Sequence, residues 1–240
     1  MAIVVADAKS LEWITFLYLS QDKEGIKEWL AFVEDSKLHD IHSKNQRDLK
    51  LSSRLIAKIF LFRCIYRGPA YAYANDPDFS KVSKSAKFWQ KIIDTFFEKY
   101  WGLNEKHIQL IQEASTTGKT ISPFGREHEH EPIRGEWNVS DITNHINQGL
   151  GADVMVIARI SFANRWMNSG LEGKLISTVH DNIIVDTPEK NIMDTTKLFH
   201  ETFRDLPKAI SKTYKLDWSL PLLCEVKAGN NQKDLTEVLL

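Results

Sequence analysis

Four side chains suited to ligand binding recur at intervals of four residues in the segment 52–68: Arg54, Lys58, Phe62 and Tyr66. On an α-helix each step of four residues rotates by about 40°, so the four side chains form one slowly drifting stripe roughly 18 Å long. Two cations followed by two aromatic rings suit a ligand with phosphates at one end and a stackable base at the other. The alternative is an ordinary amphipathic helix with a solvated basic face, and the stripe alone does not decide between them.

Two aspartates follow stretches that are typical of β-strands. Asp7 ends the apolar, β-branched run of residues 2–6, and Asp181 lies at or near the turn of a predicted hairpin over residues 174–187. A carboxylate at the end of a buried strand is costly unless it is paired, and a divalent cation is a common partner. Taken singly, Asp7 also fits a helix cap, and Asp181 an ordinary turn residue.

Two further polar patterns have candidate roles. Asn144 and Gln148 lie one turn apart on a predicted helix over residues 139–166, so they share a face and could hydrogen-bond base edges or sugars. Such a pair is more often part of an ordinary polar surface. His128 and His130 alternate with glutamates, but no other suitable ligand is nearby in the sequence, so we expect no metal site there.

The elements that must position these residues follow from hydrophobic periodicity. The strands are expected at residues 2–6, 174–187 and 222–226, and the helices at residues 11–19, 23–33, 52–68, 70–75, 81–97, 104–114, 139–166 and 189–206.

The composition excludes several classes of protein. The 240 residues carry a net charge of −1, so any contact with nucleic acid must come from a local basic surface. Two cysteines are too few for a disulfide framework, which favours a reducing compartment. The apolar stretches are too short to span a membrane, and the N-terminus lacks a signal-peptide pattern. We therefore expect a cytoplasmic protein without a membrane partner.

In their order along the chain, these motifs resemble those of the DNA polymerase I family (family A), and most closely its phage-type replicative members. The stripe resembles the fingers helix that closes on the incoming deoxynucleoside triphosphate (dNTP). Motif A is resembled by Asp7-Ala8-Lys9-Ser10-Leu11-Glu12, and the segment before the fingers helix by Asp40-Ile41-His42-Ser43-Lys44-Asn45-Gln46. The Phe-Gly-Arg signature is present as Phe124-Gly125-Arg126. The palm helix is resembled by Asn144-x3-Gln148-Gly149, and motif C by Val179-His180-Asp181.

The resemblance implies an α+β fold. A polymerase palm, with a small antiparallel sheet and helices, would comprise residues 1–35 and 137–240, and helical fingers would be inserted at about residues 36–136. The family's thumb and exonuclease domains lie before motif A. We therefore expect both to be absent from this chain, which would be the catalytic part of a split or a truncated polymerase in a bacterium or a phage-infected host. In a split polymerase, a second chain would supply the thumb, with or without the exonuclease.

The resemblance also implies roles for individual residues. Asp7, Asp181 and the carbonyl group of Ala8 would hold two Mg²⁺ ions, with Lys58 as a further catalytic residue. Glu12 would exclude a 2′-hydroxyl group. The full set of implied dNTP contacts is Glu12, His42, Arg54, Lys58, Phe62 and Tyr66. The implied contacts with primer–template DNA are Asn144, Gln148, His180 and Arg126.

The sequence departs from the family pattern at four places. Asn182 stands where many members have Glu, and Arg67 follows Tyr66 where the family usually has Gly. Glu127 replaces a further Arg, and Ser140 replaces a basic residue. We expect template-directed DNA synthesis by two-metal nucleotidyl transfer. The alternative is a catalytically idle DNA-binding or scaffold subunit, which the missing thumb favours and the retained motif residues disfavour.

Overall fold

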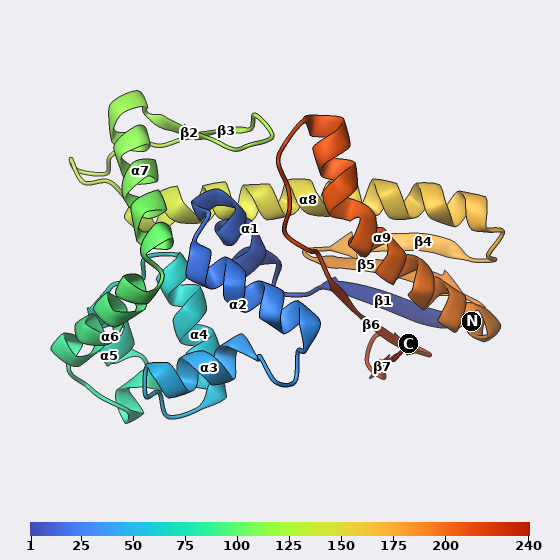
Figure 1. Ribbon diagram of the computed structural model, residues 1–240, viewed down its shortest axis with the longest axis horizontal. Helices are drawn as coiled ribbons and strands as arrows, with labels where there is room; N and C mark the ends of the chain where they lie inside the picture. The colour runs from blue at the N-terminus through green and yellow to red at the C-terminus, as the bar shows by residue number, and fades with distance from the viewer. The chain divides into compact units, whose positions relative to one another are not determined.

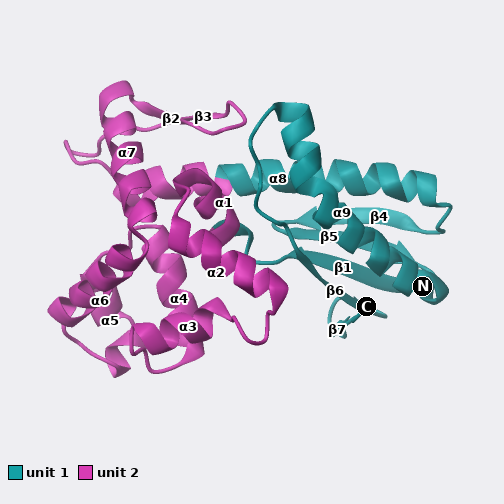
Figure 2. Cartoon of the chain, viewed as in Figure 1, with its two compact units in different colours: residues 1–12, 149–240 teal, residues 13–148 magenta.

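The computed structural model describes residues 1–240, and it confirms the predicted α+β class. The chain divides into two compact units, residues 1–12 with 149–240 and residues 13–148 (Figure 1 and Figure 2). The second unit includes residues 13–35 and 137–148, which the resemblance assigned to the palm, so the boundaries of palm and fingers stay a prediction. None of the helices combines the length and the apolar character needed to cross a membrane.

A five-stranded antiparallel sheet is the framework of the first unit, in the order β4-β5-β1-β6-β7. The strands are β1 (Ala2–Ala8), β4 (Lys174–Val179), β5 (Asn182–Thr187), β6 (Cys224–Gly229) and β7 (Thr236–Glu237). β1 is hydrogen-bonded on both sides, to β5 and to β6. The strand that carries Asp7 therefore lies in the middle of the sheet.

The two faces of this sheet differ in burial. Along β1, Val4, Ala6 and Ala8 are buried, whereas on the opposite face only Val5 is buried and Ile3 and Asp7 are half-buried. Helix α9 (Ile192–Tyr214), which follows the short 3₁₀ helix η2 (Glu189–Asn191), packs on β1 and β6 (Figure 1). Phe199 of α9 stacks on Phe162 of α8 (Val139–Ser169), with ring centroids 3.9 Å apart. The helices thus cover one face and leave the face of Asp7 accessible.

The second unit is mainly helical. Its elements are α1 (Leu11–Ser20, which begins in the first unit), α2 (Lys23–Glu34), α3 (Ile41–Asp48), α4 (Arg54–Ile65), α5 (Ala70–Asn75), η1 (Phe79–Lys81), α6 (Ala86–Lys99), α7 (Trp101–Thr117), β2 (Lys119–Ile121), β3 (Glu127–Glu129) and the first turns of α8. Aromatic rings form much of its core: Phe60 of α4 lies 5.4 Å from Tyr73 and 5.8 Å from Phe96, between ring centroids.

Helix α4 forms as the sequence predicts. The hydroxyl of Ser53 accepts a hydrogen bond from the amide of Ile56 at 3.2 Å and caps the first turn. At the other end, the amide of Gly68 donates to the carbonyl of Arg63 at 2.8 Å, which closes the last turn. Burial of Ile56, Ala57, Phe60, Leu61, Cys64 and Ile65 against the core turns the predicted stripe outward.

Several helix boundaries differ from those predicted, and the largest differences are at the start of α6 and at the end of α9. Helix α6 begins at Ala86, and not near residue 81, because the hydroxyl of Ser85 caps it by accepting from the amide of Phe88 at 3.3 Å. Helix α9 continues past the predicted end at residue 206, through Pro207, because the buried side chains of Leu206 and Ile210 extend its apolar face. Neither difference moves a candidate site residue.

Candidate active site

In the first unit, the structure brings Asp7 and Asp181 to the same end of neighbouring strands. Strands β4 and β5 are joined by a two-residue turn, His180-Asp181, in which His180 adopts a left-handed φ of 53°. Asp7 pairs across β1 and β5 with Asn182, and the amide of Ala8 donates to the carbonyl of Asp181 at 3.0 Å. This hydrogen bond holds the turn against the end of β1, so Asp7 and Asp181 are neighbours at one end of the sheet.

The surroundings of this site fit a hard divalent cation. Mg²⁺ keeps several water ligands and is usually held by one or two carboxylates together with substrate phosphates, so two aspartates suffice. The side-chain oxygen of Asn182 is buried beside them without a hydrogen-bond partner, so it can accept a hydrogen bond from a metal-bound water molecule. The two aspartates thus fit the ligand chemistry of Mg²⁺, and the role of the Ala8 carbonyl oxygen stays a prediction.

Strand β6 adds a carboxylate that the sequence analysis did not single out. Glu225 is the cross-strand neighbour of Asp7 on the side away from Asn182, and it forms an ion pair with Lys227 at 2.8 Å. Cys224, on the opposite face, remains a thiol, because burial and the charge of Asp7 raise its pKa to about 12. Only the pairing of β6 with β1 places Glu225 beside Asp7, and this pairing was not predictable from the sequence.

In the second unit, three of the predicted triphosphate contacts form a cluster. His42 is buried, and the cations Arg54 and Lys58 on α4 both act on it electrostatically. Burial lowers the pKa of His42 to about 4, against the opposing effect of Asp40 and with the help of these two cations. The ring of Phe62 lies 6.4 Å from that of His42, between centroids. His42 is therefore a neutral imidazole at pH 7, and its Nδ1 atom has no hydrogen-bond partner.

The sequence analysis missed a partner of Arg54. The Nε and Nη2 atoms of Arg54 donate to the two carboxylate oxygens of Asp40, each at 2.8 Å. Burial would raise the pKa of Asp40, but hydrogen bonds from Arg54 and Ser43 outweigh it and hold that pKa well below its usual value. Arg54 is thus exposed, as the sequence predicted, but it is also held in a bidentate ion pair that the sequence did not reveal.

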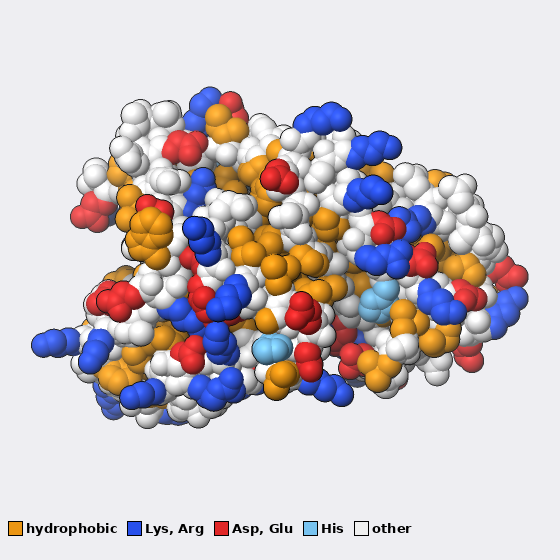
Figure 3. Space-filling view, viewed as in Figure 1, with side chains coloured by type: hydrophobic (Ala, Val, Ile, Leu, Met, Phe, Trp, Pro, Cys, Tyr) orange, Lys and Arg blue, Asp and Glu red, His pale blue; other side chains and the backbone are white.

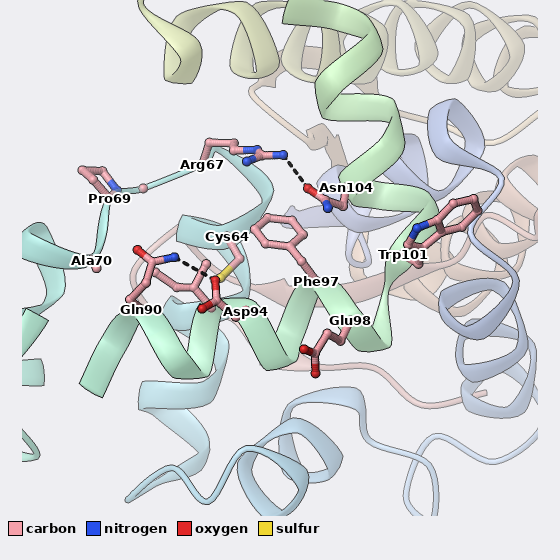
Figure 4. Close-up of a pocket in the computed structure, with 12 residues that line it drawn as sticks. Cys64, Arg67, Pro69, Ala70, Gln90, Asp94, Phe97, Glu98, Trp101 and Asn104 are labelled. Atoms are coloured by element: carbon pink, nitrogen blue, oxygen red, sulfur yellow. Dashed lines mark hydrogen bonds between the residues drawn. The ribbon is translucent and has the colours of Figure 1, made fainter. Parts of the chain in front are cut away.

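Arg67, the departure from the family pattern, has a structural explanation. With a left-handed φ of 53°, its backbone reverses the chain after α4, and its Nε atom donates to Nδ1 of His107 at 3.1 Å. A second hydrogen bond runs from Nη2 of Arg67 to Asn104 (Figure 4). The other ring nitrogen of His107 lies 2.9 Å from the carbonyl of Ile65. Arg67 therefore links the end of α4 to α7.

A cavity of about 490 Å³ opens beside Arg67, with Phe97 and Trp101 on α6 and α7 among the side chains that line it (Figure 4). Asp94 of α6 also lines it and accepts a hydrogen bond from Gln90 at 2.8 Å. None of the predicted site residues belongs to its lining. The cavity is therefore a separate feature of the second unit.

The predicted DNA-contacting residues lie on different elements. Asn144 and Gln148 share a face of α8, and the side-chain oxygen of Asn144 is buried without a hydrogen-bond partner. Arg126 is exposed at the turn between β2 and β3, and His180 is exposed in the β4–β5 turn. Basic and acidic side chains are interspersed over the face shown in Figure 3, in keeping with the net charge of −1.

A small antiparallel sheet with two carboxylates at one end, and a helix with a cationic and aromatic stripe, define a protein of the polymerase class. A family model described as DNA polymerase family A matches residues 1–234. The chain belongs to this family.

Individual relatives are distant. DNA polymerase I of Streptococcus pneumoniae is 25% identical over 240 residues, which are 95% of this chain and 25% of that protein. The DNA polymerase of Bacillus phage SP01 is 23% identical over 206 residues, 80% of this chain and 21% of that protein. The chain thus spans about a quarter of the length of these curated relatives.

Among solved structures, the fold resembles the POL domain of Pol1 from M. smegmatis, solved in complex with DNA primer-template and dNTP. The TM-score is 0.76 at 20% sequence identity, and the match covers 96% of this chain and 40% of that one. This likeness shows that the fold is that of a polymerase domain.

Proposed function

We propose that this chain catalyses template-directed DNA synthesis, in which the primer 3′-hydroxyl attacks a dNTP and pyrophosphate leaves. The observation that carries the proposal is the backbone hydrogen bond from Ala8 to Asp181, which makes the aspartates that resemble those of motifs A and C neighbours at one end of the sheet. Carboxylates from neighbouring strands are what two-metal nucleotidyl transfer requires.

In this mechanism, Asp7, Asp181 and the carbonyl oxygen of Ala8 would hold two Mg²⁺ ions. Bound there, the ions would stabilise charge on the attacking hydroxyl and on the leaving pyrophosphate. Lys58 and Arg54 would bind the triphosphate by charge, and neutral His42 by a hydrogen bond. Phe62 and Tyr66 would pack on the new base pair. Catalysis would then rest on positioning and electrostatics.

Primer extension with Mg²⁺ and the four dNTPs tests the proposal directly. A labelled primer–template should lengthen by templated nucleotides, and EDTA should stop the reaction. The rival function, a catalytically idle DNA-binding or scaffold subunit, predicts DNA binding without extension under every condition. Retention of Asp7, Asp181, Arg54 and Lys58 favours the enzyme.

Sugar selection gives a second expected result. We propose that Glu12, half-buried in the first turn of α1, bounds the 2′ face of the sugar. Glu12→Ala should therefore raise the ratio of ribonucleotide to deoxyribonucleotide incorporation by roughly tenfold or more, because the residue that excludes the 2′-hydroxyl is gone. Single-nucleotide incorporation kinetics with dCTP and CTP measure this ratio. Glu34→Ala, on α2, is the matched control, and an unchanged ratio in Glu12→Ala contradicts the assignment.

DNA binding by this chain is expected to be weak and sensitive to salt. With a net charge of −1, the chain has no global field that attracts DNA, so we propose that a second polypeptide with basic surface, such as a thumb-bearing chain, strengthens the grip. Fluorescence anisotropy with a labelled primer–template should show affinity falling steeply between about 50 and 200 mM salt. Tight binding by this chain alone at the higher salt contradicts the need for a partner.

A further inference from the structure

Asp40 contacts both helices that carry the cluster of His42, Arg54 and Lys58, which we propose as the triphosphate site. Its Oδ1 and Oδ2 atoms accept from Nη2 and Nε of Arg54. Its Oδ2 atom also accepts from the amide of Ser43 at 2.8 Å, which makes Asp40 the N-cap of α3. His42 lies in the first turn of that helix. One carboxylate therefore fixes the guanidinium on α4 and the turn that carries the imidazole.

The ion pair leaves part of Arg54 available. Nε and one donor of Nη2 are used by Asp40, so the donors of Nη1 remain for a phosphate oxygen. A planar guanidinium held along one edge presents its other edge in a fixed direction. Asp40 thus orients Arg54 without blocking it.

The pair also changes the charge of the cluster. Arg54 and Lys58 contribute two positive charges, and Asp40 cancels one of them. His42 adds none at neutral pH. A cluster with one net positive charge attracts a polyphosphate less strongly than a cluster with two.

We infer that Asp40 is the resident counter-ion and positioning residue of the triphosphate site, and that its charge keeps the affinity for bare pyrophosphate low. The ligand class in this inference rests on the proposed function. A dNTP has a base and a sugar that add contacts elsewhere, whereas pyrophosphate depends on charge alone. Asp40 therefore favours the nucleotide over the product and speeds product release.

Binding of inorganic pyrophosphate, measured by isothermal titration calorimetry without Mg²⁺, tests this inference. Asp40→Asn keeps a good N-cap residue but removes the charge. We expect Asp40→Asn to bind pyrophosphate roughly threefold to tenfold more tightly than the wild type, the scale of one partly exposed charge pair. The gain should shrink as salt rises from about 50 to 200 mM. Unchanged or weaker binding by folded Asp40→Asn overturns the inference.

Three further variants make the test specific. Asp78→Asn removes the same charge from an exposed ion pair with Lys81 and should leave pyrophosphate binding unchanged. An equal gain there would mean a general charge effect and would overturn the inference. Adding Arg54→Ala to Asp40→Asn should abolish the gain, and a gain that persists excludes Arg54 as the released group. If Asp40→Asn does not fold, Asp40→Ser, which also caps a helix, replaces it.

The pyrophosphate titration and the primer-extension test can fail independently of each other. Pyrophosphate titration needs neither DNA nor catalysis, so it decides the role of Asp40 even if the wild type fails to extend primers. If the wild type does extend primers, pyrophosphate should inhibit Asp40→Asn at roughly threefold to tenfold lower concentration than the wild type. Equal inhibition of both proteins contradicts the effect on product release.

Discussion

Replacing Asp7 or Asp181 by alanine is expected to lower Mg²⁺-dependent dNTP incorporation by roughly 10²- to 10⁴-fold, because in the proposed mechanism each carboxylate holds metal ions that stabilise the transition state by several kcal/mol. Neither change should unfold the chain. Asp7 is half-buried on the accessible face of the sheet, and Asp181 lies in a turn. Rapid-quench incorporation of a single nucleotide measures the rate, and circular dichroism monitors the fold.

The control for this experiment lies on the same sheet. Asp186 of β5 is on the face of Asp7, four residues or roughly 13 Å along the strand from Asn182. Asp186→Ala should retain the wild-type rate. Titration with Mn²⁺, followed by electron paramagnetic resonance, gives a readout independent of turnover, and Asp7→Ala and Asp181→Ala should both weaken Mn²⁺ binding. Wild-type incorporation by well-folded Asp181→Ala would remove that residue from the metal site.

The sequence was most informative where local pattern determines structure. Alternation and β-branching predicted β1 and the β4–β5 hairpin, and the interval of four residues predicted the outward stripe on α4. Both depend on contacts between near neighbours and on the burial of one face. The two carboxylates at strand ends were therefore found from the sequence, although their proximity depends on the pairing of β1 with β5.

Features that depend on long-range register could not be predicted. The neighbour relation of Asp7 and Glu225 joins residues more than two hundred positions apart, and no local pattern specifies it. Similarly, Arg67 looked like an unexplained substitution, because its partners Asn104 and His107 lie on α7.

The Asp40–Arg54 ion pair was also not predictable from local sequence, although the two residues are only fourteen positions apart. Asp40 was recognised as part of a motif, but its side chain could equally have capped α3 alone. Only the packing of α3 beside α4 adds the ion pair to the cap. A charge assigned to a ligand from sequence can thus already be balanced within the protein.

This balance leads to an expected order of effects among the cations. Lys58 is exposed on α4 beside His42, and no resident carboxylate forms a salt bridge with it. Arg54 is already paired with Asp40. Lys58 therefore supplies the uncompensated charge of the cluster, and Lys58→Ala should lower kcat/KM for dNTP by roughly 10²- to 10³-fold, as for loss of a group that stabilises developing charge. Arg54→Ala should weaken equilibrium dNTP binding less than Lys58→Ala does.

Matched variants separate charge from packing in this last comparison. Lys58→Arg keeps the cation and should restore part of the dNTP affinity, whereas Lys58→Met keeps the length without the charge and should not. Lys84→Ala removes an exposed cation outside the helices of the same unit and should have no effect. Equilibrium dNTP binding on a dideoxy-terminated primer–template measures affinity without turnover. If Arg54→Ala weakens this binding more than Lys58→Ala, then Asp40 does not neutralise Arg54 in the nucleotide-bound state, and the charge assignment of the cluster is wrong.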